Sequence, residues 1–349
     1  MRRACHFVIP GDWRTPTGGY RYDRRIGVAL RESGWQVDLC TLGDSFPWPD
    51  AATLAHAQAQ LDALPDGALV VADGLAFGAM PELAHRHVTR LRWVALVHHP
   101  LHLETGLADT ARDTLRTNEC RALQAARRVI VTSEATARDL APMGVPSNRV
   151  RVVEPGTDRV PAHRASADST VRLLCVATLT ARKGHAVLLE ALAGLPTLDW
   201  TLHCVGSTQR DTLTSDRLHR LVTELGLAER VHWHGELIEA AVAVHYAAAD
   251  LFVLPSFHEG YGMVITEALA HGLPVVCTTG GALAQTLPRT AGLHVPPGDV
   301  VALREALASL ITQPAERARF AAGARAAAEQ LPTWAQAAAR FAAVLEELA

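Results

Sequence analysis

Short runs of apolar, often β-branched residues alternate with longer amphipathic segments along the whole chain. A strand that appears as a continuous apolar run is usually covered on both faces, as in a parallel sheet flanked by helices. Segments 24–34 and 51–64 have the apolar spacing of such covering helices. The alternation therefore predicts an α/β fold with doubly wound sheets. The strand candidates are residues 5–10, 68–74, 92–99, 128–133, 171–178, 200–206, 230–235, 251–256 and 273–279.

The chain is too long for one core of ordinary size, because 349 residues exceed a soft prior of roughly 150 residues per domain. The alternation pauses at 158–169, a stretch rich in Pro, Ala and Ser that has no apolar period and is the best linker candidate. We expect domains at 1–160 and 170–330, and a final helix at 331–349 that packs toward the N-terminal domain. Its apolar face would comprise Trp334, Ala338, Phe341, Val344, Leu345 and Leu348.

Charge and cysteine content exclude several function classes. The formal charge of -3 supplies no basic field for nucleic acid and no polybasic attraction to a membrane, although local patches could still bind either. No nucleic-acid partner is expected, and membrane association would be at most peripheral. The six cysteines are scattered without the close pairs of a zinc site, and are interpreted as small hydrophobic residues in a reducing compartment. No apolar stretch approaches the roughly 20 residues that span a bilayer. A cytoplasmic location is expected.

The segment 255–276, "PSFHEGYGMVITEALAHGLPVV", holds two carboxylates eight positions apart around a Gly-Tyr-Gly bend. Its start is interpreted as the end of a strand, and a helix follows that bend, so Glu259 would lie in the loop and Glu267 inside the helix. Gly260 and Gly262 would let backbone amides at the helix amino terminus approach a diphosphate. A nucleotide sugar needs three such features: a carboxylate for its hexose, amides for its diphosphate and a second carboxylate for its ribose. A loop Glu and a helix Glu at this spacing also occur without function, with Glu267 paired to a nearby base.

The run from Glu259 to Val276 resembles, nearly residue for residue, the E-x7-E signature of retaining GT-B glycosyltransferases, especially glycosyltransferase family 4, the glycosyl transferases group 1. The resemblance covers the whole chain and is more specific in the second half. It implies a GT-B architecture, in which two Rossmann-like domains face each other across a cleft. The N-terminal domain would bind the acceptor and the C-terminal domain the nucleotide sugar.

A second segment of the C-terminal half resembles the donor-phosphate loop of the family, in which a Lys before a Gly contacts the diphosphate. Here these residues are Lys183 and Gly184. The family usually has an Arg directly after the first strand of this domain, whereas this chain has Thr178. Either Arg182 would supply the missing charge, or the pocket would rely on Lys183 alone. Without the neighbouring motif, Arg182 and Lys183 would be interpreted as a solvated turn.

His232 and His234 flank Trp233 in a segment that resembles the base pocket of the family, and His234 is assigned to donor binding. A metal pair is not expected here, because exposed or satisfied histidines on a strand are more common and no third ligand is close in sequence.

In the first half, Gly18 and Gly19 resemble the glycine-rich loop that passes close to the diphosphate and acceptor. A Gly-Gly pair alone is usually a turn. The family also carries a strand-end His near the transferred sugar, which aligns with His98, with His99 one step further on. Alternatives are a strand-capping polar residue and a metal site. The histidines that would form that metal site are His85, His87, His98, His99 and His102.

The resemblance implies transfer of a hexose from UDP-glucose or GDP-mannose to a hydroxyl acceptor, with retention, by a front-face mechanism that needs neither metal nor cofactor. Alternatives from the residues are a catalytically silent nucleotide-sugar-binding subunit, and an epimerase or phosphorylase of the same fold. Catalysis is assigned to Glu259, His98 and Lys183. The donor would contact Gly18, Gly19, Arg182, Lys183, His234, Gly260, Tyr261, Gly262, Met263, Val264 and Glu267. An apolar part of the acceptor would meet Trp13, Tyr20, Phe46, Trp48, Leu101 and Leu103.

Overall fold

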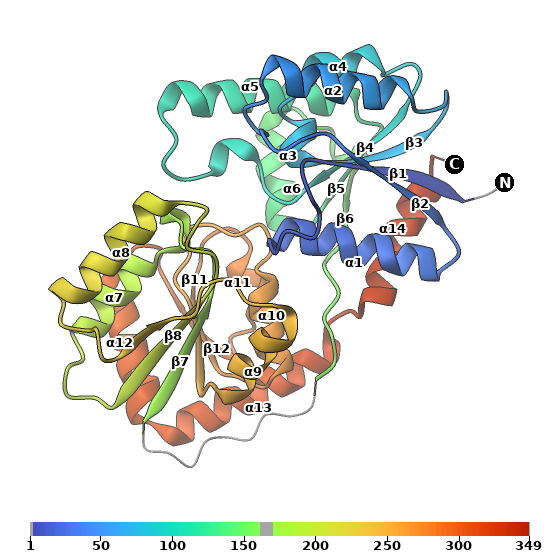
Figure 1. The fold of residues 1–349 in the computed structure, drawn as a ribbon. Coiled ribbons are helices and arrows are strands. Elements are labelled where there is room, and N and C mark those ends of the chain that lie inside the picture. The colour runs from blue at the N-terminus through green and yellow to red at the C-terminus, as the bar shows by residue number, and fades with distance from the viewer. Residues whose placement is uncertain (1–2, 161–169, 349) are drawn as a thin grey trace. The chain divides into compact units, whose positions relative to one another are not determined.

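A computed structural model describes residues 3–160 and 170–348, which form two compact units (Figure 1). The first unit is Met1–Gly156 together with Pro332–Ala349, and the second is Thr157–Leu331. Most of the linker expected at 158–169 lies outside the described residues. Each unit has its own sheet and its own apolar core, as expected from the alternation of strands and helices.

The first unit is built on a parallel sheet of six strands in the order β2-β1-β3-β4-β5-β6, with helices on both faces (Figure 1). Its strands are β1 (Ala4–Ile9), β2 (Gln36–Thr41), β3 (Leu69–Asp73), β4 (Arg92–Val97), β5 (Arg128–Val131) and β6 (Val150–Val152). Its helices are α1 (Gly18–Glu32), α2 (Ala51–Asp62), α3 (Gly74–Phe77), α4 (Pro81–Arg86), α5 (Asp109–Ala125), α6 (Glu134–Leu140) and α14 (Trp334–Glu346). Short 3₁₀ turns are η1 (Leu101–Leu103), η2 (Ala141–Met143) and η3 (Ser147–Arg149).

The second unit repeats this plan with the order β12-β11-β10-β7-β8-β9. Its strands are β7 (Val171–Val176), β8 (Trp200–Val205), β9 (Val231–Trp233), β10 (Leu251–Leu254), β11 (Val275–Thr278) and β12 (Gly292–Val295). Its helices are α7 (His185–Ala193), α8 (Thr212–Glu224), α9 (Glu239–Ala248), α10 (Met263–Ala270), α11 (Leu283–Thr286), α12 (Val300–Thr312) and α13 (Pro314–Gln330), and its 3₁₀ turn is η4 (Ala181–Lys183).

The central strands are apolar because helices cover both of their faces. Every residue of β3, β10 and β11 is buried, so side chains pointing to either face leave water. The doubly wound parallel sheets predicted from the continuous apolar runs are thereby confirmed. The strands that the sequence did not reveal, β2, β6 and β12, each lie at an edge of a sheet.

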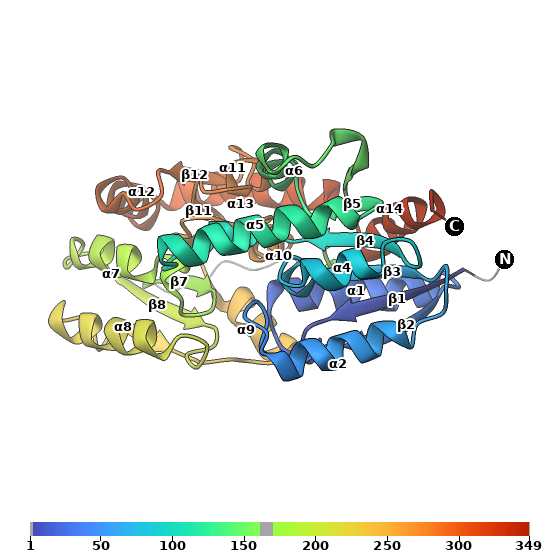
Figure 2. The same ribbon diagram turned by 90° about the horizontal axis from the view of Figure 1, so that it is seen from above.

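The last helix, α14, packs against α1 of the first unit, as predicted. Its amino end is fixed by a capping box, in which Thr333 and Gln336 bond each other's backbone. The ring of Phe341 stacks on Phe7 of β1 with centroids 6.0 Å apart. The start of β1 and the end of α14 lie at the same side of this unit (Figure 2), where Arg3 pairs with Glu346 at 2.9 Å.

Within the described ranges 3–160 and 170–348, no helix has the length and apolar content that crossing a membrane requires. All six cysteines are unpaired, and five of them are buried, which confirms that they serve as small hydrophobic residues.

Candidate functional site

In the second unit, β7 lies beside β10, although β8 and β9 separate them in the sequence. From this pair the chain proceeds to β8 and β9 on one side and to β11 and β12 on the other, so the pair is the switch point of the sheet. Doubly wound proteins bind ligands outside the carboxyl ends of the strands at such a point. The loops that leave these two strands carry Lys183 and Glu259.

The two loops are in direct contact. The backbone N–H of Phe257 donates to the carbonyl of Arg182 at 2.8 Å. Gly184 has φ of +70°, and a Cβ atom there would lie 2.1 Å from the carbonyl oxygen of Pro255. Only glycine combines this left-handed conformation with so close an approach of two backbones. The contact therefore holds the loop of Lys183 against the carboxyl end of β10.

Glu259 is the centre of the charges at this switch point. Lys183 Nζ lies 2.6 Å from its Oε1 and an Arg182 guanidinium nitrogen lies 3.3 Å from its Oε2. The hydroxyl of Ser256 donates to Oε1 at 2.7 Å. Glu259 itself is only 8% exposed, so these partners replace the water that an ionised carboxylate would otherwise require. Residues predicted separately from two segments of the sequence thus form one cluster.

The electrostatics of the cluster favour an ionised Glu259 and an additional anion. Burial alone would raise the pKa of the Glu259 carboxyl, but Lys183 and Arg182 outweigh it and lower the pKa to about 2. Two cations thus face one carboxylate at this point. Lys183 is also the only lysine in the chain, which has arginine at every other basic position. A lysine offers a compact charge on a flexible stem and is a common phosphate ligand.

A second glycine pair, which the sequence analysis did not single out, supports the Glu259 loop from the carboxyl end of β11. A Cβ atom on Gly281 would lie 2.2 Å from the carbonyl oxygen of Glu259, and one on Gly280 equally close to that of Phe257. The N–H of Ala282 donates to the Glu259 carbonyl at 2.8 Å. The signal for this pair was two glycines directly after a predicted strand, which is also the pattern of an ordinary turn.

Helix α10 begins beside Glu259. Its N-cap, Gly262, has φ of +89° and provides no side chain to bond the amides of the first turn, which begins at Met263 and Val264. The amino end of a helix has unpaired N–H groups and a partial positive charge, both of which suit a phosphate. Glu267 lies on the second turn of α10 and is half-buried. The structure thus keeps the two carboxylates on either side of this helix start, in the loop and in the helix.

His234 is not part of this cluster. It follows β9 at the edge of the sheet, which β7 and β8 separate from β10, a distance of about 14 Å at ordinary strand spacing. Its imidazole instead bonds that of His203 at 3.0 Å, and the ring of His245 lies 4.3 Å from it between centroids.

In the first unit, the switch point of the sheet lies between β1 and β3. The predicted glycine pair, Gly18 and Gly19, follows β1 and lies beside His98. Gly18 and Gly19 are the first residues of α1, whose N-cap Thr17 accepts a hydrogen bond from Tyr20 N–H. A Cβ atom on Gly19 would lie 3.1 Å from His98 Cδ2. The helix start and the imidazole are therefore neighbours, and a side chain at position 19 would occupy the space over the ring.

Two aspartates that the sequence analysis missed hold His98. Its Nε2 atom lies 3.1 Å from Asp23 of α1 and 3.4 Å from Asp73 at the end of β3. Burial alone would lower the pKa of His98, but the two carboxylates outweigh it and raise the pKa to about 10, so the imidazole is protonated at neutral pH. Burial raises the pKa of the Asp23 carboxyl, against the lowering effect of His98. An isolated Asp inside a helix or at a strand end carries no distinctive sequence signal.

The other histidines of the 85–102 region have partners of their own. His99 faces Glu104 at 3.5 Å, which leaves His98 as the one that meets Gly19. His85 bonds the Arg121 carbonyl and His87 faces Asp62. Within residues 3–160, these five histidines are not gathered around one point.

The apolar loop residues proposed for the acceptor have different surroundings. Phe46 belongs to the core of the first unit and Leu101 is also buried, so neither presents a surface to a ligand. Trp13 lies against Gly27 of α1, where a Cβ atom would be 3.1 Å from its ring. Trp48 is 49% exposed.

Two protein families match adjacent parts of the chain. Residues 158–327 match the family described as glycosyl transferases group 1, and residues 68–160 match the one described as glycosyltransferase family 4. The matches include both switch-point loops of the second unit and His98 of the first.

Similar curated proteins include a D-inositol 3-phosphate glycosyltransferase of Xylanimonas cellulosilytica, which is 32% identical over 60% of this chain and 54% of its own length. An MMP alpha-(1->4)-mannosyltransferase of Mycolicibacterium hassiacum is 28% identical over 73% of this chain and 65% of its own. The chain thus spans between about half and two-thirds of the length of these relatives.

Solved structures show the same fold over nearly the whole chain. A sucrose-phosphate synthase from Thermosynechococcus elongatus superposes with a TM-score of 0.82 at 24% identity and covers 99% of both chains. Anabaena Alr3699/HepE, in complex with UDP and glucose, has a TM-score of 0.78 at 21% identity and covers 97% of this chain and 99% of its own. The fold is therefore of the GT-B type.

Proposed function

The chain belongs to glycosyltransferase family 4, the glycosyl transferases group 1, and from that premise we propose that it transfers a hexose from a nucleoside diphosphate sugar to a hydroxyl acceptor with retention of configuration. The observation that carries this proposal is the cluster of Glu259, Lys183 and Arg182 at the switch point of the second unit, beside the amino end of α10.

The donor diphosphate would bind to the cations and the helix start. Lys183 and Arg182 bring two positive charges to this point, and the first amides of α10 add the positive end of a helix dipole. Charge develops on the diphosphate as the bond from the sugar to its leaving oxygen breaks. Groups that are already oriented toward that charge stabilise the transition state without reorganising.

Glu259 would orient the sugar and Glu267 the ribose. With its pKa lowered to about 2, Glu259 is ionised at neutral pH and acts solely as a hydrogen-bond acceptor, which suits sugar hydroxyls. Glu267 is half-buried on the second turn of α10. It would accept hydrogen bonds from the ribose hydroxyls in the same way.

His98 would bind near the primary hydroxyl of the transferred sugar. The aspartates behind it keep the imidazole protonated, so it is a hydrogen-bond donor and a positive charge. Gly19 leaves its ring uncovered on one side, since a larger residue there would contact it.

The reaction itself would be a front-face displacement. The bond between the anomeric carbon and the phosphate oxygen breaks as the acceptor oxygen bonds the same carbon from the same face. The released phosphate oxygen accepts the proton of the acceptor hydroxyl. The protein contributes orientation and electrostatic stabilisation, and none of its side chains becomes covalently attached.

The donor is proposed to be a UDP-hexose such as UDP-glucose or, alternatively, GDP-mannose. HepE supports the first, since it was solved with UDP and glucose. The mannosyltransferase among the relatives supports the alternative, a mannose donor. D-inositol 3-phosphate, named for another relative, is the first acceptor to test.

The proposal is tested by a thermal-shift screen of UDP-, GDP- and ADP-sugars, followed by transfer assays with the labelled donor. A donor at 100 times its dissociation constant should stabilise the protein by about 2.7 kcal/mol. Lys183→Met should abolish this stabilisation. Arg319→Met, which removes an exposed cation paired with Glu316 on α13, should leave it unchanged. If no donor raises the melting temperature, or if Lys183→Met responds like the wild type, the proposal is wrong.

Retention is measured on the product. The proton spectrum of the glycosylated acceptor should show the same anomeric configuration as the donor. An inverted product would contradict the proposed front-face displacement while leaving the donor site intact.

A further inference from the structure

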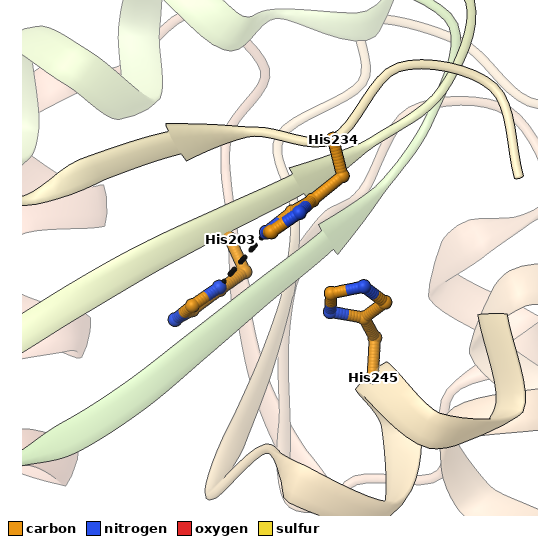
Figure 3. Close-up of side chains that lie close together, drawn as sticks. All are labelled: His203, His234 and His245. Carbon is orange, nitrogen blue, oxygen red and sulfur yellow. Dashed lines mark hydrogen bonds between the residues drawn. The ribbon is translucent and has the colours of Figure 1, made fainter. Parts of the chain in front are cut away.

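Three histidines from separate elements of the second unit converge on one point (Figure 3). His203 lies in β8, His234 follows β9, and His245 lies in α9. Figure 3 shows the rings of His203 and His234 lying parallel and the ring of His245 directed toward them. One nitrogen of each ring lies within 4.8 Å of the other two, and all three residues are half-buried. We call these residues the histidine cluster.

The distances in the histidine cluster are close to those of metal ligands. Imidazole nitrogens bind zinc at about 2.0–2.1 Å in tetrahedral geometry, which places neighbouring ligand nitrogens about 3.3 Å apart. His203 Nδ1 and His234 Nε2 are already 3.0 Å apart. The remaining nitrogen pairs lie at most 4.8 Å apart. The backbone arrangement is therefore compatible with one ion bound by three nitrogens.

The protonation state of the cluster also suits a metal. Burial and the neighbouring histidines lower the pKa of His203 to about 4, and burial together with its neighbours lowers that of His234. Burial lowers the pKa of His245 as well. These shifts favour the neutral imidazole, which has a lone pair to offer to a metal ion.

A hydrogen bond between two of the rings does not account for the third. One of His203 Nδ1 and His234 Nε2 must donate to the other, and this leaves His245 packed against the pair without sharing in the bond. A metal ion uses all three nitrogens together. The other nitrogen of His203 lies 3.4 Å from the Thr201 hydroxyl, which would accept its proton and fix the ring orientation that a ligand needs.

We propose that His203, His234 and His245 bind one divalent transition-metal ion of the zinc class through their imidazole nitrogens, and that this ion fastens α9 to β8 and β9. Zinc, nickel and copper ions accept imidazole, whereas magnesium and calcium prefer oxygen ligands. Three nitrogens from the protein would leave the fourth position of a tetrahedral ion to water.

A metal ion at this position would strengthen the attachment of α9 to the sheet. Tyr246 is the one fully buried side chain that the helix provides, and Val244 is 66% exposed. A helix with so little buried apolar surface gains little from packing alone. A metal bond to His245 would link it to both neighbouring strands. Because no third ligand was close in sequence, this site could not be found before β8 and α9 were placed beside His234.

The histidine cluster is distinct from the cluster around Glu259, so the inference does not depend on the proposed transfer reaction. The ion would hold α9, and the donor diphosphate would still be bound by Lys183, Arg182 and the start of α10.

The test uses the full chain, freed of metal with a chelator that is then removed. Titration calorimetry with zinc chloride should show one ion per chain, and cobalt chloride should give the intense visible absorption of a tetrahedral site. His245→Ala and His203→Ala should each weaken zinc binding at least 100-fold. Alanine is well tolerated in a helix, so the first variant preserves α9. Its circular dichroism and metal-free melting temperature should match the wild type.

Two histidine variants serve as controls. His232→Ala removes an exposed imidazole that is not among the three ligands, although its ring centroid lies 4.9 Å from that of His203. His56→Ala removes a surface histidine of the first unit. Both should bind zinc as the wild type does, and zinc should raise the melting temperature of these proteins but not that of His245→Ala. Wild-type binding no tighter than that of His245→Ala, or equal loss in either control, would overturn the proposal.

Discussion

The contact between Gly184 and Pro255 can be tested by placing one methyl group on Gly184. Gly184 separates Lys183 from the start of α7 and has φ of +70°. In Gly184→Ala, the new Cβ atom would lie 2.1 Å from the Pro255 carbonyl oxygen, against 3.4–4 Å for an ordinary contact. One of the two loops must therefore move by about 1 Å, which is large compared with the tight packing of protein interiors.

The chain contains a matched control for this change. Gly226 has φ of +69° in the same unit, and nothing lies within 4 Å of the Cβ position. Both variants bear the cost of a left-handed alanine, about 1 kcal/mol. Only Gly184→Ala also overpacks its surroundings, which typically costs about 1–3 kcal/mol more. We expect the free energy of unfolding to fall by about 1 kcal/mol in Gly226→Ala and by about 2–4 kcal/mol in Gly184→Ala.

The two variants should also differ in donor binding. Displacing the Lys183 loop separates the ammonium group from the place where we propose the diphosphate binds, so nucleotide affinity should fall at least tenfold in Gly184→Ala and not at all in Gly226→Ala. Urea unfolding measures the first effect, and calorimetry with the nucleotide from the donor screen measures the second. Equal unfolding free energies and equal affinities in the two variants would refute the idea that this backbone contact positions Lys183.

Three further predictions concern the charges of the two switch points. The pKa of Glu259 in the folded protein, about 2, is below its ordinary value of 4.5, so the ionised carboxylate stabilises the fold above pH 4.5 and this contribution is lost as the pH falls toward 2. Glu259→Gln should therefore cost about 3 kcal/mol in urea unfolding at pH 7 and progressively less below pH 4.5; a cost independent of pH would contradict the assignment. Asp23→Asn should lower the pKa of His98, and NMR titration of the imidazole measures this pKa. An unchanged pKa would show that Asp23 does not hold the proton there. Thr178→Arg restores the residue usual in the family and should preserve or strengthen donor affinity in calorimetry, and a tenfold loss would count against the proposed position of the diphosphate.

The strands that could be predicted from the sequence are mostly those buried on both faces. β3, β10 and β11 are continuous apolar runs because helices cover them on each side. At the edges, β2 buries only Val37 and Cys40, and β6 is half-buried throughout. Edge strands bury less apolar surface and so leave a weaker signal in the composition of the chain.

The site was predictable where its residues are neighbours in the sequence. Glu259, the glycines and Glu267 belong to one short segment, and the loop, the helix start and the helix follow from their local pattern. The partners of His98 were not predictable, because Asp23 and Asp73 come from other elements and neither has a distinctive neighbour.

By itself, the sequence determined the fold class, the helical character of the last segment, and the acidic segment around α10, because each depends on a periodicity or a motif within a few turns of chain. The tertiary structure alone decided which distant groups meet: Lys183 with Glu259, and His203 with His234 and His245. The reason is that such meetings depend on the order of strands in the sheet. Strand order is set by the packing of the whole unit, and no local stretch of the chain encodes it.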